Sequence, residues 1–386
     1  MKKIIYLCYM PLQSKIEKDF YMDYLLEKKI NIEYWDVSSI YFKGVNFLDG
    51  ISRDYVKKIN SLEDLEVKLK NTDILNASFI ININYQIIVL KLFRILSKYK
   101  CKLLFFARGI LPSPYYGKRK IFPRIINNLC HYRLKLLPAR IYNKIILILY
   151  KKLRLIKDFD VVFAAGDIAA RLYKNKSEVV RVNYFDYDNY LTVVHNKRLI
   201  EDRYCVFLDD CYLSHPDLNM FKMKTINPDM YCQSLNSFFR NIEEKYGLSV
   251  VIASHPKANY TDSGVFDKRN IIGGKTPDLV KDCEFAVTHM SSSVSYAVLY
   301  KKPVIFIYTN EIQQFYGHTF FPLTMQFAKE LSCNVYNIDA IRNKDEISFN
   351  AVDAEKYEAY KYNYLVSKES EGRLSKDIFM GYIQTH

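Results

Sequence analysis

Acidic residues are missing from a long central stretch of this sequence. No Asp or Glu lies between Asp73 and Asp158, whereas residues 91–157 carry 18 Lys and Arg. The formal net charge of the whole chain is +14, so this one segment accounts for its basicity. Such a surface suits an anionic partner, namely membrane lipid, an anionic glycan or nucleic acid. The plain alternative is a solvated basic face without a partner.

The sequence also lacks the cysteine patterns of metal and redox sites. Its eight Cys residues form no CxxC pair and no Cys/His cluster with zinc spacing. Several of them, including Cys8, Cys205 and Cys283, lie in apolar runs, where a reduced thiol behaves as a small hydrophobic side chain. This usage excludes a zinc-finger module and predicts a reducing, cytoplasmic environment.

No apolar run is long enough to cross a bilayer. The first residues, MKKIIYLCYMP, are too short for a signal peptide and look like a first strand. The run Ile145–Tyr150 stops at Lys151, far below the ~20 residues that a membrane-spanning helix needs. We therefore expect no membrane-spanning helix and, with the cysteine usage, a cytoplasmic protein.

Short apolar runs alternate with amphipathic stretches along the chain. This alternation predicts an α/β protein with parallel sheets and crossover helices. At 386 residues, two domains are expected. The predicted strands are Ile4–Tyr9, Ile32–Val37, Ile74–Ile83, Lys102–Ala107, Val161–Ala164, Cys205–Leu208, Val250–Ala253, Phe285–Thr288 and Pro303–Tyr308, with helices such as Ser14–Lys28 and Cys232–Tyr246.

The pattern breaks between Tyr184 and Arg203, in a polar and aromatic stretch without an apolar period. We place the domain boundary just after this stretch. The prediction is then two Rossmann-like domains, 1–198 and 199–386. The tail from Ala354 is expected to be helical, with a final helix that can pack back on the first domain.

Two of the predicted strands in the second half end in chemically useful side chains. Ligands of open parallel sheets bind at the carboxyl ends of the strands. Asp209 and Asp210 follow the first strand, where a carboxylate is a candidate general base for an attacking hydroxyl; an ordinary loop or capping Asp is the alternative. His255 precedes Pro256, which holds it extended and presents its imidazole to a phosphate; the alternative is a surface His in a turn.

Two further segments are candidates for binding a nucleotide. The run Thr288–Ser293 links a strand to a helix, so its hydroxyls and N–H groups would meet at a phosphate unless they only cap the helix. The run Gly273–Pro277 lacks the GxxxxGK[ST] pattern of a P-loop and predicts a tight turn into a helix, capped by Thr276. The candidates for binding the nucleotide and its phosphate are Ser291, Ser292, Ser293, Gly274, Lys275 and Thr276.

One motif suggests a metal. Asp186 and Asp188 form an Asp-x-Asp pair, and two carboxylates can hold a divalent ion that bridges a diphosphate. However, the pair is short, and it lies at the expected domain joint instead of after a strand. We therefore expect no metal.

An acidic pair, a His-Pro and a serine pair, in this order on one Rossmann-like half, resemble a known group of enzymes. The group comprises bacterial sialyltransferases, polysialyltransferases and Kdo transferases of GT-B architecture, which use CMP-activated 2-keto sugars. The matching residues are Asp209-Asp210, His255-Pro256 and Ser291–Ser293, and the stretches FLDDCYLSHP and VIASHPK look like a surface-polysaccharide branch. The resemblance covers roughly residues 203–310. Cys211 stands where the pattern has Gly, and a second His-Pro, His215-Pro216, follows the acidic pair too closely to be the phosphate-binding one.

The resemblance implies a GT-B-like architecture, in which the two Rossmann-like domains face a central cleft. It also implies a glycosyltransferase that moves a sialic-acid-like or Kdo-like sugar from a CMP donor to a hydroxyl of a surface glycan or glycolipid, such as capsule, O-antigen or lipooligosaccharide. His255, with Pro256 and Lys257 beside it, would bind the donor phosphate together with the serine hydroxyls. Asp209 or Asp210 would be the base, and Asp209 is favoured because it directly follows the strand. The first domain would bind the acceptor, and the protein would be peripheral at the inner face of the plasma membrane, attached to its anionic surface through residues 91–157. Neither a metal nor another cofactor is implied.

Three alternatives stay open at this point. A CDP-glycerol or CDP-ribitol phosphotransferase of the teichoic-acid kind has a similar His-Pro and Ser-Ser. A generic transferase of nucleotide-diphosphate sugars comes next. A non-catalytic membrane-binding protein would use only the basic segment. Nucleic acid is not expected as a partner, because the segment is rich in Leu and Ile and carries no known reader motif.

Overall fold

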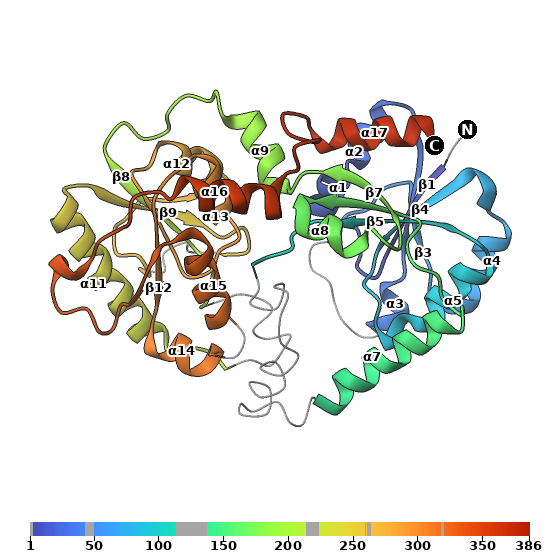
Figure 1. The fold of residues 1–386 in the computed structure, drawn as a ribbon, viewed down its shortest axis with the longest axis horizontal. Helices are drawn as coiled ribbons and strands as arrows, with labels where there is room; N and C mark the ends of the chain where they lie inside the picture. The colour runs from blue at the N-terminus through green and yellow to red at the C-terminus, as the bar shows by residue number, and fades with distance from the viewer. Residues whose placement is uncertain are drawn as a thin grey trace. The chain divides into compact units, whose positions relative to one another are not determined.

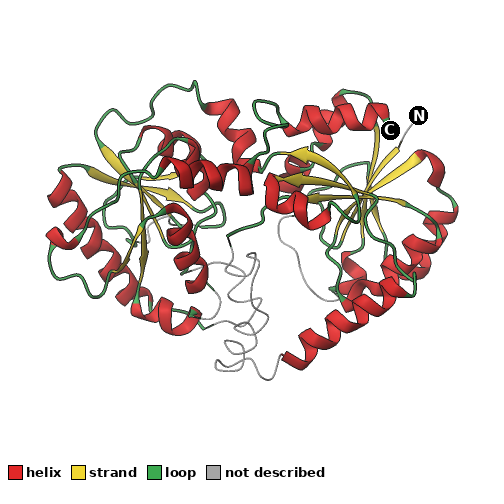
Figure 2. Ribbon diagram, in the orientation of Figure 1, coloured by secondary structure: helices red, strands yellow, loops and turns green. Residues whose placement is uncertain are grey.

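The computed structural model describes residues 3–42, 50–112, 137–213, 224–258, 260, 264–317 and 320–386. The chain divides into two compact units, each built on one parallel sheet with helices on both faces (Figures 1 and 2). Unit 1 takes most of the chain up to Asn183 together with Glu369–His386, and unit 2 takes Tyr184–Lys368. The predicted α/β class with two Rossmann-like sheets is confirmed.

Unit 1 holds a seven-stranded sheet in the order β3-β2-β1-β4-β5-β6-β7, and every pairing in it is parallel. Its strands are β1 (Lys3–Cys8), β2 (Asn31–Asp36), β3 (Val56–Lys58), β4 (Ala77–Asn82), β5 (Lys102–Ala107), β6 (Val161–Ala165) and β7 (Glu178–Val182). Its helices are α1 (Ser14–Asp19), α2 (Met22–Glu27), α3 (Ser38–Tyr41), α4 (Leu62–Lys70), α5 (Leu90–Lys98), α7 (Leu137–Lys152), α8 (Gly166–Tyr173) and α17 (Ser375–Thr385), with the short turns η1 (Ile74–Asn76) and η2 (Ile87–Val89).

The last helix, α17, completes the core of unit 1. Its Phe379 is fully buried, and the ring centroid lies 5.2 Å from that of Phe106 and 5.1 Å from that of Phe163, both on central strands. The apolar side chains of α17 join the same cluster as those of β1 and β2. The chain therefore returns to its first unit after building the second.

Unit 2 holds a six-stranded sheet in the order β10-β9-β8-β11-β12-β13, again with every pairing parallel. Its strands are β8 (Tyr204–Leu208), β9 (Ser249–Ser254), β10 (Ile271–Gly273), β11 (Ala286–Thr288), β12 (Val304–Tyr308) and β13 (Asn334–Asn337). Its helices are α9 (Phe185–Val193), α11 (Pro228–Tyr246), α12 (Thr276–Asp282), α13 (Val294–Leu299), α14 (Asn310–Tyr316), α15 (Phe321–Leu331) and α16 (Ala354–Tyr360), with the 3₁₀ helix η3 (Lys344–Glu346) and the π-helix η4 (Lys361–Leu365).

The order of strands in unit 2 creates a switch point beside β8. The chain runs outward from β8 through β9 to β10, and then returns to β11 on the other side of β8. Connections that leave in opposite directions open a crevice at the carboxyl ends of the two central strands, which is where such sheets bind ligands.

Three expectations about local structure change. Residues 14–28 form two helices instead of one, because Tyr21 takes a left-handed φ of 61° between them. Helix α11 begins at Pro228, earlier than Cys232, because Asn227 caps it by accepting from Met230 N–H. The polar stretch after Tyr184 forms α9, which packs on α12 and α13, so the units divide between Asn183 and Tyr184 and not at 198.

Within the described ranges, no helix combines the length and the apolar character that crossing a bilayer requires. The part of the basic segment from 113 to 136 and the second His-Pro, His215-Pro216, lie outside the residues that the structure describes.

Candidate active site

The four motifs of the second half follow four adjacent strands. In the sheet order, β10, β9, β8 and β11 are consecutive neighbours, and their carboxyl ends meet at one edge. The residues at these ends are Gly273-Gly274 after β10, Ser254-His255 at β9, Asp209-Asp210 after β8 and Thr288–Ser293 after β11. The fold therefore brings together all the residue types that the sequence analysis selected.

Asp209 binds the loop on the β9 side. One carboxylate oxygen, Oδ1, accepts from Cys211 N–H at 2.9 Å. The other, Oδ2, accepts from His255 N–H at 3.1 Å and from the Tyr260 hydroxyl at 2.8 Å. Asp209 is buried, and both of its oxygens are engaged, so this carboxylate fixes the backbone that carries His255.

Asp210 binds the loop on the opposite, β11 side. Its Oδ2 accepts from the N–H groups of His289 at 3.2 Å and Met290 at 3.1 Å, and the Thr288 hydroxyl lies 3.4 Å away. Among the residues described, its Oδ1 has no hydrogen-bond partner. The acidic pair therefore joins the two loops that flank β8, and Asp210 keeps one oxygen available.

The pKa of Asp210 suits a proton acceptor near neutral pH. Burial raises the pKa of this carboxyl from 3.8 to about 7, and the neighbouring Asp209 also raises it. The N–H groups of Met290 and His289 act in the opposite direction, because they stabilise the ionised form, but they do not offset the loss of solvation. A base works best when its pKa lies near the working pH.

Cys211 occupies a backbone position that favours glycine. Its φ is 55°, in the left-handed region, and the residue is fully buried. A non-glycine residue there costs about 1–2 kcal/mol. The turn that follows the acidic pair thus has a conformation that favours glycine, and here a cysteine adopts it.

Changing Cys211 is expected to reveal this strain. Because only glycine adopts a left-handed φ without steric cost, Cys211→Gly should be more stable than Cys211→Ala by about 1 kcal/mol. Equilibrium unfolding in urea measures the difference, and because both variants lose the thiol, they differ only in the β-carbon. An alanine variant as stable as the glycine variant would show that the turn does not hold this conformation.

His255 is oriented through its Nδ1 atom. That nitrogen accepts from the Lys257 N–H at 3.1 Å, and the His255 carbonyl accepts from Ala258 N–H at 2.9 Å. A neutral imidazole with Nδ1 as acceptor carries its proton on Nε2. His255 therefore presents a donor, while Pro256 and Lys257 lie exposed in the same turn.

The serine run supplies hydroxyl groups after β11. Ser293 takes the N-cap position of α13 without making a side-chain cap bond. In the described part of the chain, the hydroxyls of Ser292 and Ser293 have no hydrogen-bond partner, and all three serines are partly exposed. Ser291 N–H binds the Thr288 hydroxyl at 3.1 Å, which ties the run to the strand end. Helix α13 is only six residues long, so these hydroxyls matter more than its dipole.

Two residues support the site in roles that the sequence did not indicate: Tyr260, which no motif singled out, and His289, which lies within the run Thr288–Ser293. Tyr260 binds Asp209, and burial, together with this carboxylate, raises the pKa of its phenol. His289 is fully buried, with Nδ1 donating to the Ile307 carbonyl at 2.8 Å and Nε2 bound to the Tyr231 hydroxyl at 2.9 Å. Burial lowers the pKa of His289 to about 4, so its ring stays neutral and anchors the β11 loop. Both contacts join distant parts of the chain, and no local pattern indicates them.

The glycine turn after β10 lies beside His255. Gly273 pairs with Ser254, and a Cβ added to Gly273 would lie 3.2 Å from the Ser254 hydroxyl oxygen. Gly274 has a φ of 69°, a conformation that glycine adopts easily. Thr276 is the first residue of α12 and not its cap: Lys275 takes that place without a side-chain bond, so the expected Thr276 cap is wrong. Lys275 is exposed.

The Asp-x-Asp pair has another partner. The Asp186 carboxylate accepts from the buried Ser295 hydroxyl on α13, which ties α9 to α13. Across the described ranges, no group of three His, Cys, Asp or Glu side chains gathers as a metal site would require. The expectation of a metal-free reaction stays a prediction.

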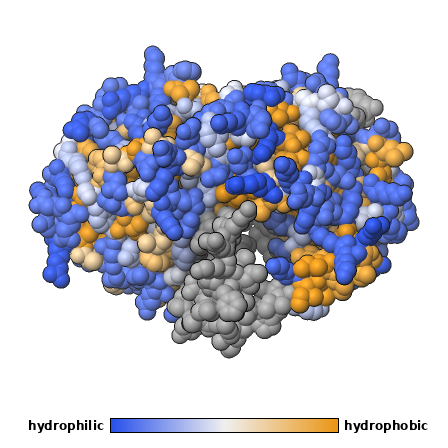
Figure 3. Space-filling model, in the orientation of Figure 1, coloured by the Kyte–Doolittle hydropathy of each residue, from blue (hydrophilic) through white to orange (hydrophobic). Residues whose placement is uncertain are grey.

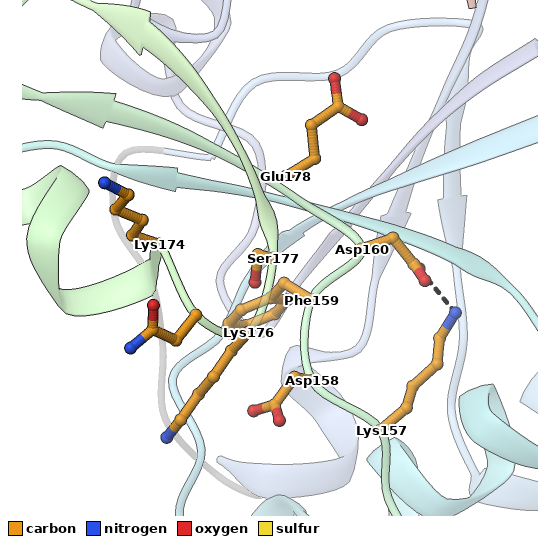
Figure 4. A pocket seen from close by; sticks show the side chains of 9 residues that line it. Lys157, Asp158, Phe159, Asp160, Lys174, Lys176, Ser177 and Glu178 are labelled. Atoms are coloured by element: carbon orange, nitrogen blue, oxygen red, sulfur yellow. Dashed lines mark hydrogen bonds and ion pairs between the residues drawn. The ribbon is translucent and has the colours of Figure 1, made fainter.

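A surface pocket lies in unit 1, at the amino ends of β6 and β7 (Figure 4). Its charged side chains largely face solvent, and two of them, Lys157 and Asp160, pair at 2.5 Å. Ligands of parallel sheets bind at the opposite, carboxyl ends of strands. The pocket is therefore a poor candidate for the active site.

Two parallel Rossmann-like sheets and a polar site at strand ends define the architecture class, and comparisons with known proteins agree with it. No protein-family model and no curated protein matches the chain. A structure of the wall teichoic acid polymerase TagF is similar, with a TM-score of 0.52 at 13% identity, over 100% of this chain and 90% of that one. So is Phytolacca americana UGT2 complexed with UDP-2fluoro-glucose and pterostilbene, with a TM-score of 0.50 at 9% identity over 100% and 99%.

A third similar structure is the UDP-GlcNAc 2-epimerase of Methanocaldococcus jannaschii, with a TM-score of 0.46 at 16% identity over 100% of both chains. At such identities a likeness shows the fold alone. The fold is of the GT-B type, as the sequence analysis predicted.

Proposed function

We propose that this protein is a glycosyltransferase that uses a CMP-activated sugar, of a sialic-acid-like or Kdo-like 2-keto kind, and transfers it to a hydroxyl of a surface glycan or glycolipid. One observation carries the proposal. The acidic pair after β8 holds the His255 turn with one carboxylate and the β11 loop with the other. This arrangement sets a candidate base between two candidate phosphate-binding groups. The structural likeness to UGT2, which was solved with a nucleotide sugar, supports the general class.

The proposed reaction is a single displacement of CMP. The acceptor oxygen forms a bond to the anomeric carbon of the sugar, and the bond from that carbon to the phosphate oxygen breaks. The acceptor proton passes to a carboxylate, which later releases it to water. The leaving phosphate gains negative charge and needs hydrogen-bond donors.

The donors that we assign to the phosphate are His255 and the serine run. The Nε2–H of His255 follows from the Nδ1 contact to Lys257, and the hydroxyls of Ser292 and Ser293 are free of described partners. Gly274, Lys275 and Thr276 flank the same edge and are proposed to line the nucleotide. These donors meet the charge of a single phosphate, so we propose that no metal takes part.

Asp210 is the better candidate for the base. Asp209 uses both oxygens to hold three donors, whereas Asp210 has one oxygen that no described residue binds. The pKa of Asp210, raised to about 7 by burial, also fits proton transfer near neutral pH. This assignment reverses the preference for Asp209 that strand proximity suggested.

A second candidate function is transfer of a polyol phosphate from a CDP-polyol, as in teichoic-acid synthesis. The likeness to the wall teichoic acid polymerase TagF favours it. CMP is the leaving group in both reactions, so the same phosphate donors would serve either one. With a CMP-sugar the carbon–oxygen bond breaks and no phosphorus reaches the product. With CDP-glycerol labelled at its β-phosphate the label would move into the acceptor, which separates the two.

A thermal-shift screen with CMP, CDP, UDP and GDP, without added metal, tests the proposed donor. We expect CMP or CDP to stabilise the protein and UDP and GDP to have no effect. A ligand at 100 times its dissociation constant adds about 2.7 kcal/mol to the free energy of unfolding. Stabilisation only by UDP with Mn²⁺ would contradict the proposal and would favour a metal at Asp186 and Asp188.

We further propose that unit 1 binds the acceptor and that the protein works at the cytoplasmic face of the membrane. The support is the basic segment 91–157, which suits an anionic membrane surface. A glycolipid acceptor would be presented at that surface.

A further inference from the structure

Helix α7 exposes an apolar face that no described residue covers. Large apolar and aromatic side chains, each between 45% and 60% exposed, lie on it and just after it: Tyr142, Ile145, Ile148, Leu149 and Leu153. At 3.6 residues per turn, these positions fall on one side of the helix. Figure 3 shows a hydrophobic area at the place where Figure 1 labels α7. Soluble proteins rarely leave such a continuous patch exposed.

The opposite face of α7 is held only lightly. None of the described side chains from 142 to 152 is buried, whereas α11 buries six of its residues. On this inner side, Lys151 pairs with Asp158, and its Nζ lies 4.2 Å from the centroid of the Tyr85 ring. The helix therefore rests on unit 1 through half-buried side chains such as Ile146, Leu147 and Tyr150 and through the contacts of Lys151, while a second apolar face points to solvent.

The charges beside the apolar face indicate what covers it. Lys152 lies exposed on the same side and Lys144 lies exposed at its edge, and neither has an ion-pair partner in the described part of the chain. Arg154 follows, also exposed. A second copy of the chain would bring these like charges together, whereas anionic lipid headgroups would neutralise them. Basic side chains beside large apolar ones are typical of helices that lie in a membrane interface.

We propose that α7 is an interfacial helix, lying in the plane of an anionic bilayer with Ile145, Ile148 and Leu149 at the boundary between headgroups and acyl chains. This rests on the membrane attachment proposed above and makes it specific. Attachment is hydrophobic as well as electrostatic, so salt weakens it but does not abolish it. Each basic side chain at the surface contributes about 1 kcal/mol, or roughly fivefold in affinity.

Tryptophan fluorescence tests the insertion directly. The only tryptophan, Trp35, is fully buried and gives a constant background. Tyr142→Trp places a reporter on the apolar face, and Leu172→Trp, at a similarly exposed site on α8, is the matched control. With vesicles of phosphatidylcholine and phosphatidylglycerol, we expect Tyr142→Trp to shift its emission to the blue and to be quenched by brominated acyl chains. The control should show neither effect.

Co-sedimentation with the same vesicles measures the apolar contribution. The double variant Ile145→Ser, Ile148→Ser should bind the vesicles at least about tenfold more weakly than the wild type. The reason is that two apolar side chains no longer move from water into the membrane. The pair Val67→Ser, Leu172→Ser removes equally exposed side chains of unit 1 and should bind as the wild type does. All four residues are exposed, so folding is preserved, which thermal unfolding checks.

Three results would overturn the proposal. The first is vesicle binding that high salt abolishes completely, and the second is a Tyr142→Trp emission spectrum that does not shift when the protein is bound to vesicles. The third is a dimer of the protein that the double variant Ile145→Ser, Ile148→Ser dissociates. Stabilisation by CMP is measured on the same variants and should be unchanged. If CMP fails to stabilise the protein while α7 inserts, the proposed donor is wrong and the interfacial helix stands.

Discussion

Asp210→Asn is expected to lower turnover by about 10²–10⁴-fold and, at the same time, to stabilise the protein above pH 7. The loss of rate follows if this carboxylate accepts the acceptor's proton, since an amide cannot. The gain in stability has a separate cause. Burial opposes the ionised carboxylate and raises its pKa to about 7, whereas an amide of the same shape carries no charge.

The pH dependence of the wild type's stability determines where Asp210→Asn is the more stable protein. Because the pKa is raised from 3.8 to about 7, the folded state holds a proton that the unfolded state has released at intermediate pH. The contribution of Asp210 to stability is therefore fully present below about pH 4 and is lost as the pH rises to about 7. The melting temperature of Asp210→Asn should match that of the wild type at pH 4 and exceed it at pH 8. In the wild type, kcat/KM should rise with pH up to about 7 and then level off.

Asp209→Asn is the matched control, with the opposite expectation for stability. Asp209 accepts on both oxygens, from Cys211, His255 and Tyr260, so an amide group must turn its NH₂ toward at least one donor. A buried donor left unsatisfied costs about 1–3 kcal/mol. In Asp210 only Oδ2 has described partners, so the amide oxygen can take its place. If Asp209→Asn were the stabilised variant and Asp210→Asn kept full turnover, the two roles assigned here would be wrong.

The central strands of both sheets were predictable from the sequence, and the edge strands were not. The apolar runs ending at Ala107 and Leu208 are buried throughout or nearly so, and they match β5 and β8. The four unpredicted strands β3, β7, β10 and β13 are the outermost strands of the two sheets. Edge strands face solvent along one side and are half-exposed here, so they lack a continuous apolar run.

The residues of the candidate site were predictable from the sequence, but the hydrogen bonds between them were not. A polar residue directly after an apolar run indicates a strand end, and four such ends lie together because the strands are adjacent. The roles of Asp209 and Asp210 depend on which donors surround each oxygen. Those donors come from Tyr260 and Met290, which lie far from the acidic pair in sequence. The left-handed φ of Cys211 is likewise visible only in the folded backbone.

His255→Ala is expected to weaken CMP binding and to lower kcat/KM by about 10²–10³-fold, the usual cost of losing one donor to a developing negative charge. The imidazole would contact the phosphate before and during bond breaking, so affinity and turnover should fall together. Folding should be little affected, because His255 contacts Asp209 through its backbone N–H, which alanine keeps, and the Lys257 N–H that loses its acceptor lies in an exposed turn. Calorimetry with CMP and steady-state kinetics measure the two effects.

Lys257→Ala is the control: it keeps the backbone N–H that orients His255, so it should lose at most the attraction of one exposed ammonium group. Unchanged CMP affinity in His255→Ala, with thermal unfolding equal to that of the wild type, would show that the phosphate is bound elsewhere.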